Sequence, residues 1–129
     1  GPAQGPPPAG GSAQQTAVAW ARQELGRPYV WAGSGPDVFD CSGLVMYVYS
    51  QAGVSFPHSA QLQYDDTSRV SSGELIPGDL VFFGGGPSGV SHVGIYVGGG
   101  QMIHAPYTGT VVQYSGIYWP DLVGFGRVG

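Results

Sequence analysis

The sequence has almost no basic side chains: its 129 residues include four arginines and no lysine, and its formal net charge is −4. Proteins that bind nucleic acid neutralise phosphates with a basic surface, so we expect no nucleic-acid partner. Only 9% of residues are charged, against about a quarter in an average globular protein. The surface must therefore consist largely of uncharged polar groups, which suits neutral polar ligands.

Long apolar runs are also missing, since none approaches the roughly 18 residues of a membrane span, and we expect no membrane association. Cysteine is nearly absent as well: Cys41 is the only one. A single cysteine excludes an internal disulfide and leaves one thiol whose role needs an explanation. The length fits one domain with one hydrophobic core, and we expect a monomer.

The chain opens with a Pro/Gly-rich stretch, residues 1–11, whose composition is typical of a linker or flexible arm. We therefore place the folded domain at 12–129. Ser12 and Gln15 form a capping box, which predicts a helix that runs from there to Gly26. A second helix is predicted from Cys41 to Gly53, with Asp40 as its N-cap.

The second half of the chain changes character. After an irregular segment with one helical turn near 60–64, short β-prone runs alternate with Gly, Pro and Asp. We predict strands in the runs 79–84, 90–98, 101–106, 109–116 and 122–129. Helices followed by strands indicate an α+β domain, in which the N-terminal helices pack on one face of a central antiparallel sheet of about five to six strands.

Two histidines lie in consecutive predicted strands joined by glycines 98–100. A three-residue glycine loop would pair residue 94 with residue 104, which puts His92, Gly94 and His104 on one face of the sheet. The two imidazoles would then be diagonal neighbours, close enough to touch. A two-residue loop without a bulge would instead place them on opposite faces.

This arrangement suits a triad in which one histidine accepts the proton of Cys41 and the other orients the first. The positive end of the helix that begins at Cys41 is expected to lower the pKa of the thiol, although Asp40 opposes this. Two other interpretations remain open. Cys41 is a structural core residue, or Cys41, His92 and His104 bind zinc, although no local ligand motif accompanies them. His58 is expected at the surface or rim.

Four stretches together resemble the NlpC-type cysteine endopeptidases of bacterial cell walls, a compact branch of the papain-like fold: "RPYVWAGSGPDVFDCSGLV", "PGDLVFF", "SHVGIYVGGGQMIHAP" and "FGRV". The resemblance covers about residues 14–128 and identifies 12–129 as an NlpC-type cysteine peptidase domain. It implies that Cys41 is the nucleophile, His92 the general base and acid, and His104 the third, orienting residue. Family members carry His, Asn, Gln or Glu at this third place.

The resemblance also implies further site residues. Tyr29 would help the backbone N–H of Cys41 to stabilise the oxyanion, and Asp40 and Ser42 would line a pocket for the free amine of a stem peptide. We add Ser91 and Gln63 as substrate-binding residues. Relatives more often have Ser at the position of Ala60, which puts one supporting hydrogen bond in doubt.

The implied activity is hydrolysis of peptidoglycan stem peptides at the D-γ-glutamyl–diamino acid (meso-diaminopimelate) bond through a thioester, with no cofactor and no metal. The resemblance also implies secretion to the cell wall or periplasmic space, with a signal peptide absent from this sequence, and other cell-wall hydrolases as partners. Two alternatives remain: a non-catalytic or occluded peptidoglycan-binding module, and a related papain-like amidase or acyltransferase.

Overall fold

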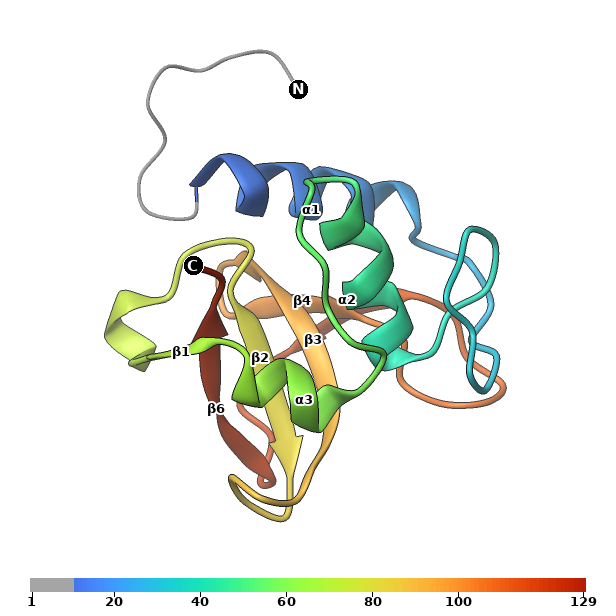
Figure 1. Cartoon of the computed structure of the whole chain (residues 1–129). Helices are drawn as coiled ribbons and strands as arrows, with labels where there is room; N and C mark the ends of the chain where they lie inside the picture. Colours follow the sequence, from blue (N-terminus) through green and yellow to red (C-terminus); the bar gives the residue numbers. More distant parts are fainter. Residues whose placement is uncertain (1–10) are drawn as a thin grey trace.

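The computed structural model describes residues 11–129, so the predicted linker lies, apart from Gly11, outside the described residues. Three helices come first in the chain: α1 (Gly11–Gln23), α2 (Cys41–Ser50) and α3 (Ala60–Asp65). Six strands and a short 3-10 helix follow: β1 (Ser68–Val70), η1 (Ser72–Glu74), β2 (Leu80–Gly84), β3 (Val90–Gly98), β4 (Gln101–His104), β5 (Gln113–Gly116) and β6 (Leu122–Arg127). Figure 1 shows α1 along the top, α2 at the upper right and α3 over the lower part of the sheet.

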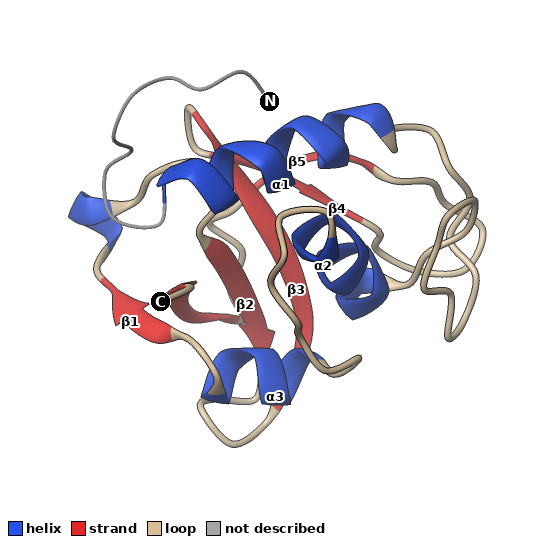
Figure 2. Cartoon of the chain, turned by 45° about the horizontal axis from the view of Figure 1, so that its top comes forward, coloured by secondary structure: helices blue, strands red, loops and turns tan. Residues whose placement is uncertain are grey.

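The strands form one antiparallel sheet in the order β1-β6-β2-β3-β4-β5. β2 and β3 are therefore central, and the run "LVFF" in β2 is buried on both faces of the sheet. Such continuous burial explains why β2 reads as an unbroken apolar run rather than an alternating one. The predicted α+β architecture, with helices on a sheet of five to six strands, is confirmed (Figure 2).

Two groups of buried side chains hold the layers together. The larger lies between the helices and the sheet and includes Leu44, Val48 and Ile95. The smaller lies on the other sheet face and comprises Val81, Phe83, Met102, Ile117 and Phe125. Because both faces of the central strands are covered, the side chains of β3 are fixed in position on either side.

The structure corrects the prediction in three places. α1 already includes Ser12, which is therefore not its N-cap, and it ends at Gln23 rather than at Gly26. The strand predicted at 109–116 is shorter, because only 113–116 belongs to β5. β1 lies in a segment predicted as irregular; its three residues are mostly exposed, and their strand conformation follows from pairing with β6.

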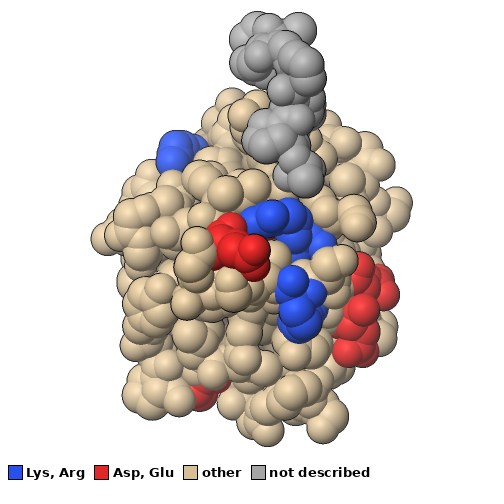
Figure 3. Space-filling view, turned by 90° about the vertical axis from the view of Figure 1, so that its left-hand side faces the viewer, with Lys and Arg blue, Asp and Glu red and all other residues tan. Residues whose placement is uncertain are grey.

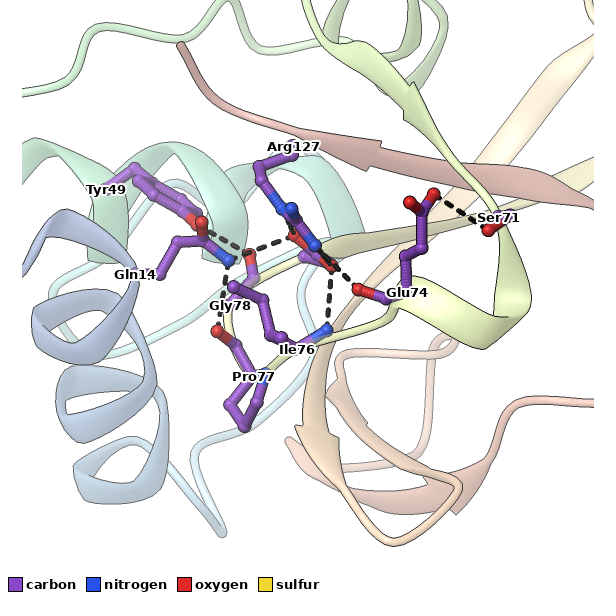
Figure 4. A network of polar contacts seen from close by, with 9 residues as sticks. Gln14, Tyr49, Ser71, Glu74, Ile76, Pro77, Gly78 and Arg127 are labelled. Carbon is purple, nitrogen blue, oxygen red and sulfur yellow. Dashed lines mark hydrogen bonds and ion pairs between the residues drawn. The ribbon is translucent and has the colours of Figure 1, made fainter. Parts of the chain in front are cut away.

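A buried carboxylate, that of Asp79, joins α1, β6 and the start of β2. Its partners Gln14, Ile76 and Arg127 are labelled in Figure 4. Asp79 accepts hydrogen bonds from Arg127 Nε and Nη2, both at 2.8 Å, and from Gln14 Nε2 at 3.0 Å. The backbone N–H of Ile76 donates to Oδ2 at 2.9 Å. A buried charge is tolerated only when paired and hydrogen-bonded, and Asp79 has both kinds of partner.

Charged side chains are few on the surface as well. On the face shown in Figure 3 they gather near the middle, and uncharged residues make up most of the rest. Among the described residues, no helix has the length and apolar character needed to cross a membrane.

Candidate active site

The single cysteine stands at the first position of α2. Asp40 caps the helix, because its Oδ1 accepts a hydrogen bond from Gly43 N at 2.7 Å. Gly43 allows a close approach of the preceding loop, since a Cβ there would lie 1.9 Å from the carbonyl oxygen of Gly33. That carbonyl also accepts from Asp40 N at 2.8 Å. The loop is thus held against the first turn of α2, which fixes the position of Cys41.

The thiol of Cys41 is partly buried against the core shared by α2 and β3. Burial raises the pKa of the Cys41 thiol above its ordinary value, the backbone N–H of Val93 lowers it, and Asp40 raises it further. The prediction of a lowered pKa is therefore wrong for the resting site, because loss of hydration outweighs the helix dipole. The resting thiol is neutral and requires a base.

The β3–β4 hairpin brings His92 and His104 together. His92 Nε2 lies 2.8 Å from His104 Nδ1, and the ring centroids are 5.1 Å apart. The strands pair Ile95 with Ile103 and Tyr96 with Met102, which is the predicted register. Gly94 allows the close approach of β4 side chains, because a Cβ there would lie 2.4 Å from Met102 Sδ and 3.3 Å from His104 Cβ. The expected juxtaposition of the two histidines is thus present.

The loop that sets this register differs from the predicted three-glycine loop. The turn itself contains only Gly99 and Gly100, and the register shifts between Tyr96 and Gly98 through a bulge. A bulge adds one unpaired residue to its strand. The bulge therefore compensates for the shorter turn, and both histidines remain on one face.

Both imidazoles are neutral near pH 7. Burial lowers the pKa of His92 to about 4, although the Asp121 carboxylate raises it in part. Burial, and then the neighbouring His92, lower the pKa of His104 to about 3. Nδ1 of His92 is free for another partner because its Nε2 faces His104. Nε2 of His104 is buried and has no hydrogen-bond partner among the described residues.

Tyr29 lies on the loop before Cys41. Its backbone N–H donates to Thr110 O at 2.9 Å, and it forms an isolated bridge with Phe39. Burial raises the pKa of the Tyr29 hydroxyl, and Cys41 and then Asp40 add to this effect. The phenol therefore lies within electrostatic range of the thiol.

Asp40 has a second neighbour that the sequence did not indicate. His58 Nε2 lies 2.7 Å from Asp40 Oδ1, the same oxygen that caps α2. Ser42 Oγ donates to this oxygen at 3.5 Å. Among the described residues Oδ2 accepts no side-chain or backbone hydrogen bond. One carboxylate oxygen is thus used by the protein, and the other is available. His58 lies at the rim, as expected, but in contact with Asp40.

The remaining predicted site residues lie in different surroundings. Ser42 is buried beside Asp40. Gln63 is fully buried, and its Nε2 donates to Ser42 O at 3.0 Å and to Pro57 O at 2.8 Å. Its side chain therefore ties the loop of His58 to α2, and any effect on a ligand is indirect. Ser91 is exposed next to Gly84, where the β2–β3 register shifts.

Trp119 is a further aromatic neighbour of the histidines that the sequence reasoning missed. Its ring is stacked on His92 and meets His104 edge to face. No motif in "IYWPDL" marks this residue, because its position depends on how the β5–β6 connection folds back.

The zinc alternative finds no support in the grouping of side chains. Within residues 11–129 no three His, Cys, Asp or Glu side chains are arranged so that they could hold a metal ion.

The sequence and fold match known proteins. The family model described as "NlpC/P60 family" matches residues 26–122. The probable endopeptidase p60 of Listeria monocytogenes is 52% identical over 115 residues, which are 86% of this chain and 23% of that protein. The bifunctional muramidase/DL-endopeptidase CwlT of Bacillus subtilis is 46% identical over 121 residues, or 88% of this chain and 36% of that protein. The chain thus spans about a quarter to a third of these relatives.

A solved structure gives the same result for the fold. RipD of Mycobacterium tuberculosis, described as a non-catalytic NlpC/p60 domain protein adapted to peptidoglycan binding, superposes with a TM-score of 0.79 at 30% identity. The match covers 91% of this chain and 98% of that one. Because the family model matches most of the chain and RipD matches it over nearly its whole length, this chain belongs to the NlpC/P60 family.

Proposed function

We propose that this domain hydrolyses a peptide bond in peptidoglycan stem peptides through a covalent thioester on Cys41. One observation carries the proposal. The single thiol, at the start of α2, lies next to the backbone of Val93 in β3, and the residue before Val93, His92, is hydrogen-bonded to His104. The endopeptidase names of the relatives and the peptidoglycan-binding function in the description of RipD support the substrate class. Because RipD shares the fold without catalysis, it is these side chains, rather than the fold, that support hydrolysis.

The mechanism begins with proton transfer from Cys41 to His92 Nδ1. The thiolate attacks the scissile carbonyl carbon, and the oxyanion is stabilised by the Cys41 backbone N–H, which is free at the helix start, and by Tyr29. Collapse of the intermediate breaks the C–N bond, and His92 gives its proton to the leaving amine. Water, deprotonated by His92, then hydrolyses the thioester and restores the thiol.

His104 has to act as a hydrogen-bond acceptor in this mechanism. For His92 to take a proton on Nδ1, its Nε2 must carry a proton and donate it to His104 Nδ1. His104 then carries its own proton on Nε2, which is buried and unpartnered among the described residues. Leaving a buried donor unpaired costs about 1–3 kcal/mol. In the alternative tautomer the same nitrogen would be an unpaired acceptor, so either tautomer carries such a cost.

We expect His104→Asn to retain most of the turnover of the wild type, because the amide oxygen can accept the bond from His92 Nε2. His104→Ala should lower kcat by roughly a hundredfold, since the general base loses its orienting partner. Steady-state hydrolysis of a stem tripeptide measures both. An Asn variant as slow as the Ala variant would contradict the acceptor role.

The free oxygen of Asp40 supports a substrate with a positively charged amine. Oδ1 is occupied by Gly43 N and His58, whereas Oδ2 remains available for an ammonium group. We propose that it binds the N-terminal amine of a stem peptide, and that the cleaved bond joins D-glutamate, through its γ-carboxyl, to the diamino acid. The DL-endopeptidase name of CwlT supports this choice of bond.

Digestion of a free stem tripeptide and of its N-acetylated form, followed by mass spectrometry, tests both the amine-binding role of Asp40 and the choice of cleaved bond. We expect acetylation of the amine to lower kcat/KM by about 10- to 100-fold, because a charge-assisted hydrogen bond contributes about 1.5–3 kcal/mol. Asp40→Asn, which can still cap α2, should lower kcat/KM by the same factor for the free peptide and change it little for the acetylated peptide.

Asp37→Asn serves as the control, because Asp37 is an exposed acid on the same approach loop, and it should not change the preference. Equal cleavage of both peptides would exclude the amine pocket. A folded protein that binds stem peptides without cleaving them would favour the binding module, and cleavage of other acyl substrates would favour the amidase or acyltransferase. Action on stem peptides implies a location at the cell wall, where other wall hydrolases are candidate partners.

A further inference from the structure

Trp119 lies against both histidines from the β5–β6 connection. Its ring is parallel to that of His92 within 4°, with centroids 5.9 Å apart, and it meets His104 at 68° and 5.4 Å. Trp119 is partly buried and packs on the smaller core group, so its ring contacts both that core and the two histidines. One face of the catalytic imidazole is therefore covered by an indole.

The stack is supported from the sheet. Phe83 of β2 is fully buried and is the cross-strand partner of His92. Its ring lies 4.8 Å from Trp119 and 5.6 Å from His92 between centroids. The indole is thus held at a defined place, and its backbone is fixed by the turn in which Leu122 N donates to Trp119 O at 3.1 Å.

An indole face stabilises a neighbouring ring that becomes positively charged. Its negative quadrupole attracts a cation within about 6 Å of the ring centroid, and offset or parallel aromatic pairs restrict ring rotation. His92 must become an imidazolium when it takes the thiol proton. The groups placed around His92 are Trp119 and Asp121 from the β5–β6 connection, Phe83 from β2 and His104 from β4. Of these, only Asp121 is an acid.

We propose that Trp119 is a positioning residue for catalysis, which fixes the ring plane of His92 and stabilises its imidazolium when Cys41 is deprotonated. This inference rests on the proposed role of His92 as the base. It predicts that loss of the indole face lowers the reactivity of the thiol and kcat, and leaves KM nearly unchanged, because Trp119 acts through His92.

Alkylation of Cys41 by iodoacetamide across pH 5–9 tests this without a peptidoglycan substrate, because the chain has only one cysteine. Trp119→Leu fills the space without a π face, and Trp119→Phe retains one. We expect Leu to slow alkylation at pH 7 by about tenfold and Phe to restore most of the rate, in line with the strength of a cation–π contact. Tyr118→Ala, at the exposed neighbouring position, should match the wild type.

Stem-peptide hydrolysis by the same variants should show the loss in kcat. Wild-type alkylation rates at every pH in the Leu variant, with only a lower melting temperature, would overturn the inference, as would equal rates for the Leu and Phe variants. The outcome is separable from that of the proposed function. A wild type that cleaves no stem peptide would refute the activity, whereas alkylation that depends on the indole would still establish the coupling of Trp119 to the thiol.

Discussion

Replacement of Cys41 by Ala is expected to abolish stem-peptide hydrolysis, with a loss of at least about 10⁴-fold in kcat. Removal of the nucleophile from a covalent catalyst leaves only the contribution of binding and oxyanion stabilisation. The fold should not suffer, because Ala is a good helix former and Cys41 is only partly buried. Peptide digestion followed by mass spectrometry measures the loss, and thermal unfolding checks the fold.

Chemical modification of the Cys41 thiol in the wild type should abolish hydrolysis as well. Because Cys41 is the only cysteine, iodoacetamide should inactivate the wild type with one adduct per chain. The Ala variant should still bind the stem peptide with an affinity close to that of the wild type. Cleavage by the Ala variant at the wild-type rate would mean that another group carries the reaction.

Asp79→Ala should lower the free energy of unfolding by about 3–5 kcal/mol, the usual effect of removing one member of a buried ion pair. Arg127, whose side chain is 23% exposed, loses both of its carboxylate contacts, and the N–H of Ile76 loses its acceptor. Since the total free energy of unfolding of a small domain is only about 5–15 kcal/mol, urea denaturation should show a much lower midpoint.

Glu74→Gln is the matched control. Arg127 contacts only the backbone oxygen of Glu74, so exchange of that exposed side chain should change stability by less than about 0.5 kcal/mol. If the Asp79→Ala midpoint equals that of Glu74→Gln, the network around Asp79 contributes little to stability.

Most of the architecture could be predicted from periodicity and turn residues. The five strands predicted in the second half are all present as β2 to β6, and the helical turn predicted near 60–64 is α3. β1 could not be predicted, because its three residues are largely exposed and carry no alternating pattern. Such a strand exists only through its partner, and that partner lies more than fifty residues later.

Part of the site could also be predicted from local sequence patterns. His92 and His104 are close in sequence, and a short hairpin converts sequence spacing into spatial proximity. His58 reaches Asp40 from one loop, and Trp119 reaches His92 from another. No short-range sequence pattern predicts either contact. The raised pKa of the Cys41 thiol could not be predicted from the sequence, because a helix start is a local feature, whereas burial depends on all the residues packed around the thiol.

The bulged turn between β3 and β4 has an evolutionary consequence. The bulge absorbs one residue, so loss of a single glycine from 98–100 together with the bulge would leave a regular two-residue turn and the same pairing of Ile95 with Ile103. The two histidines would then still emerge on one face, although their separation along the chain would fall by one from its present twelve positions. A motif search that requires a fixed spacing of the histidines would therefore reject chains in which the pair is assembled.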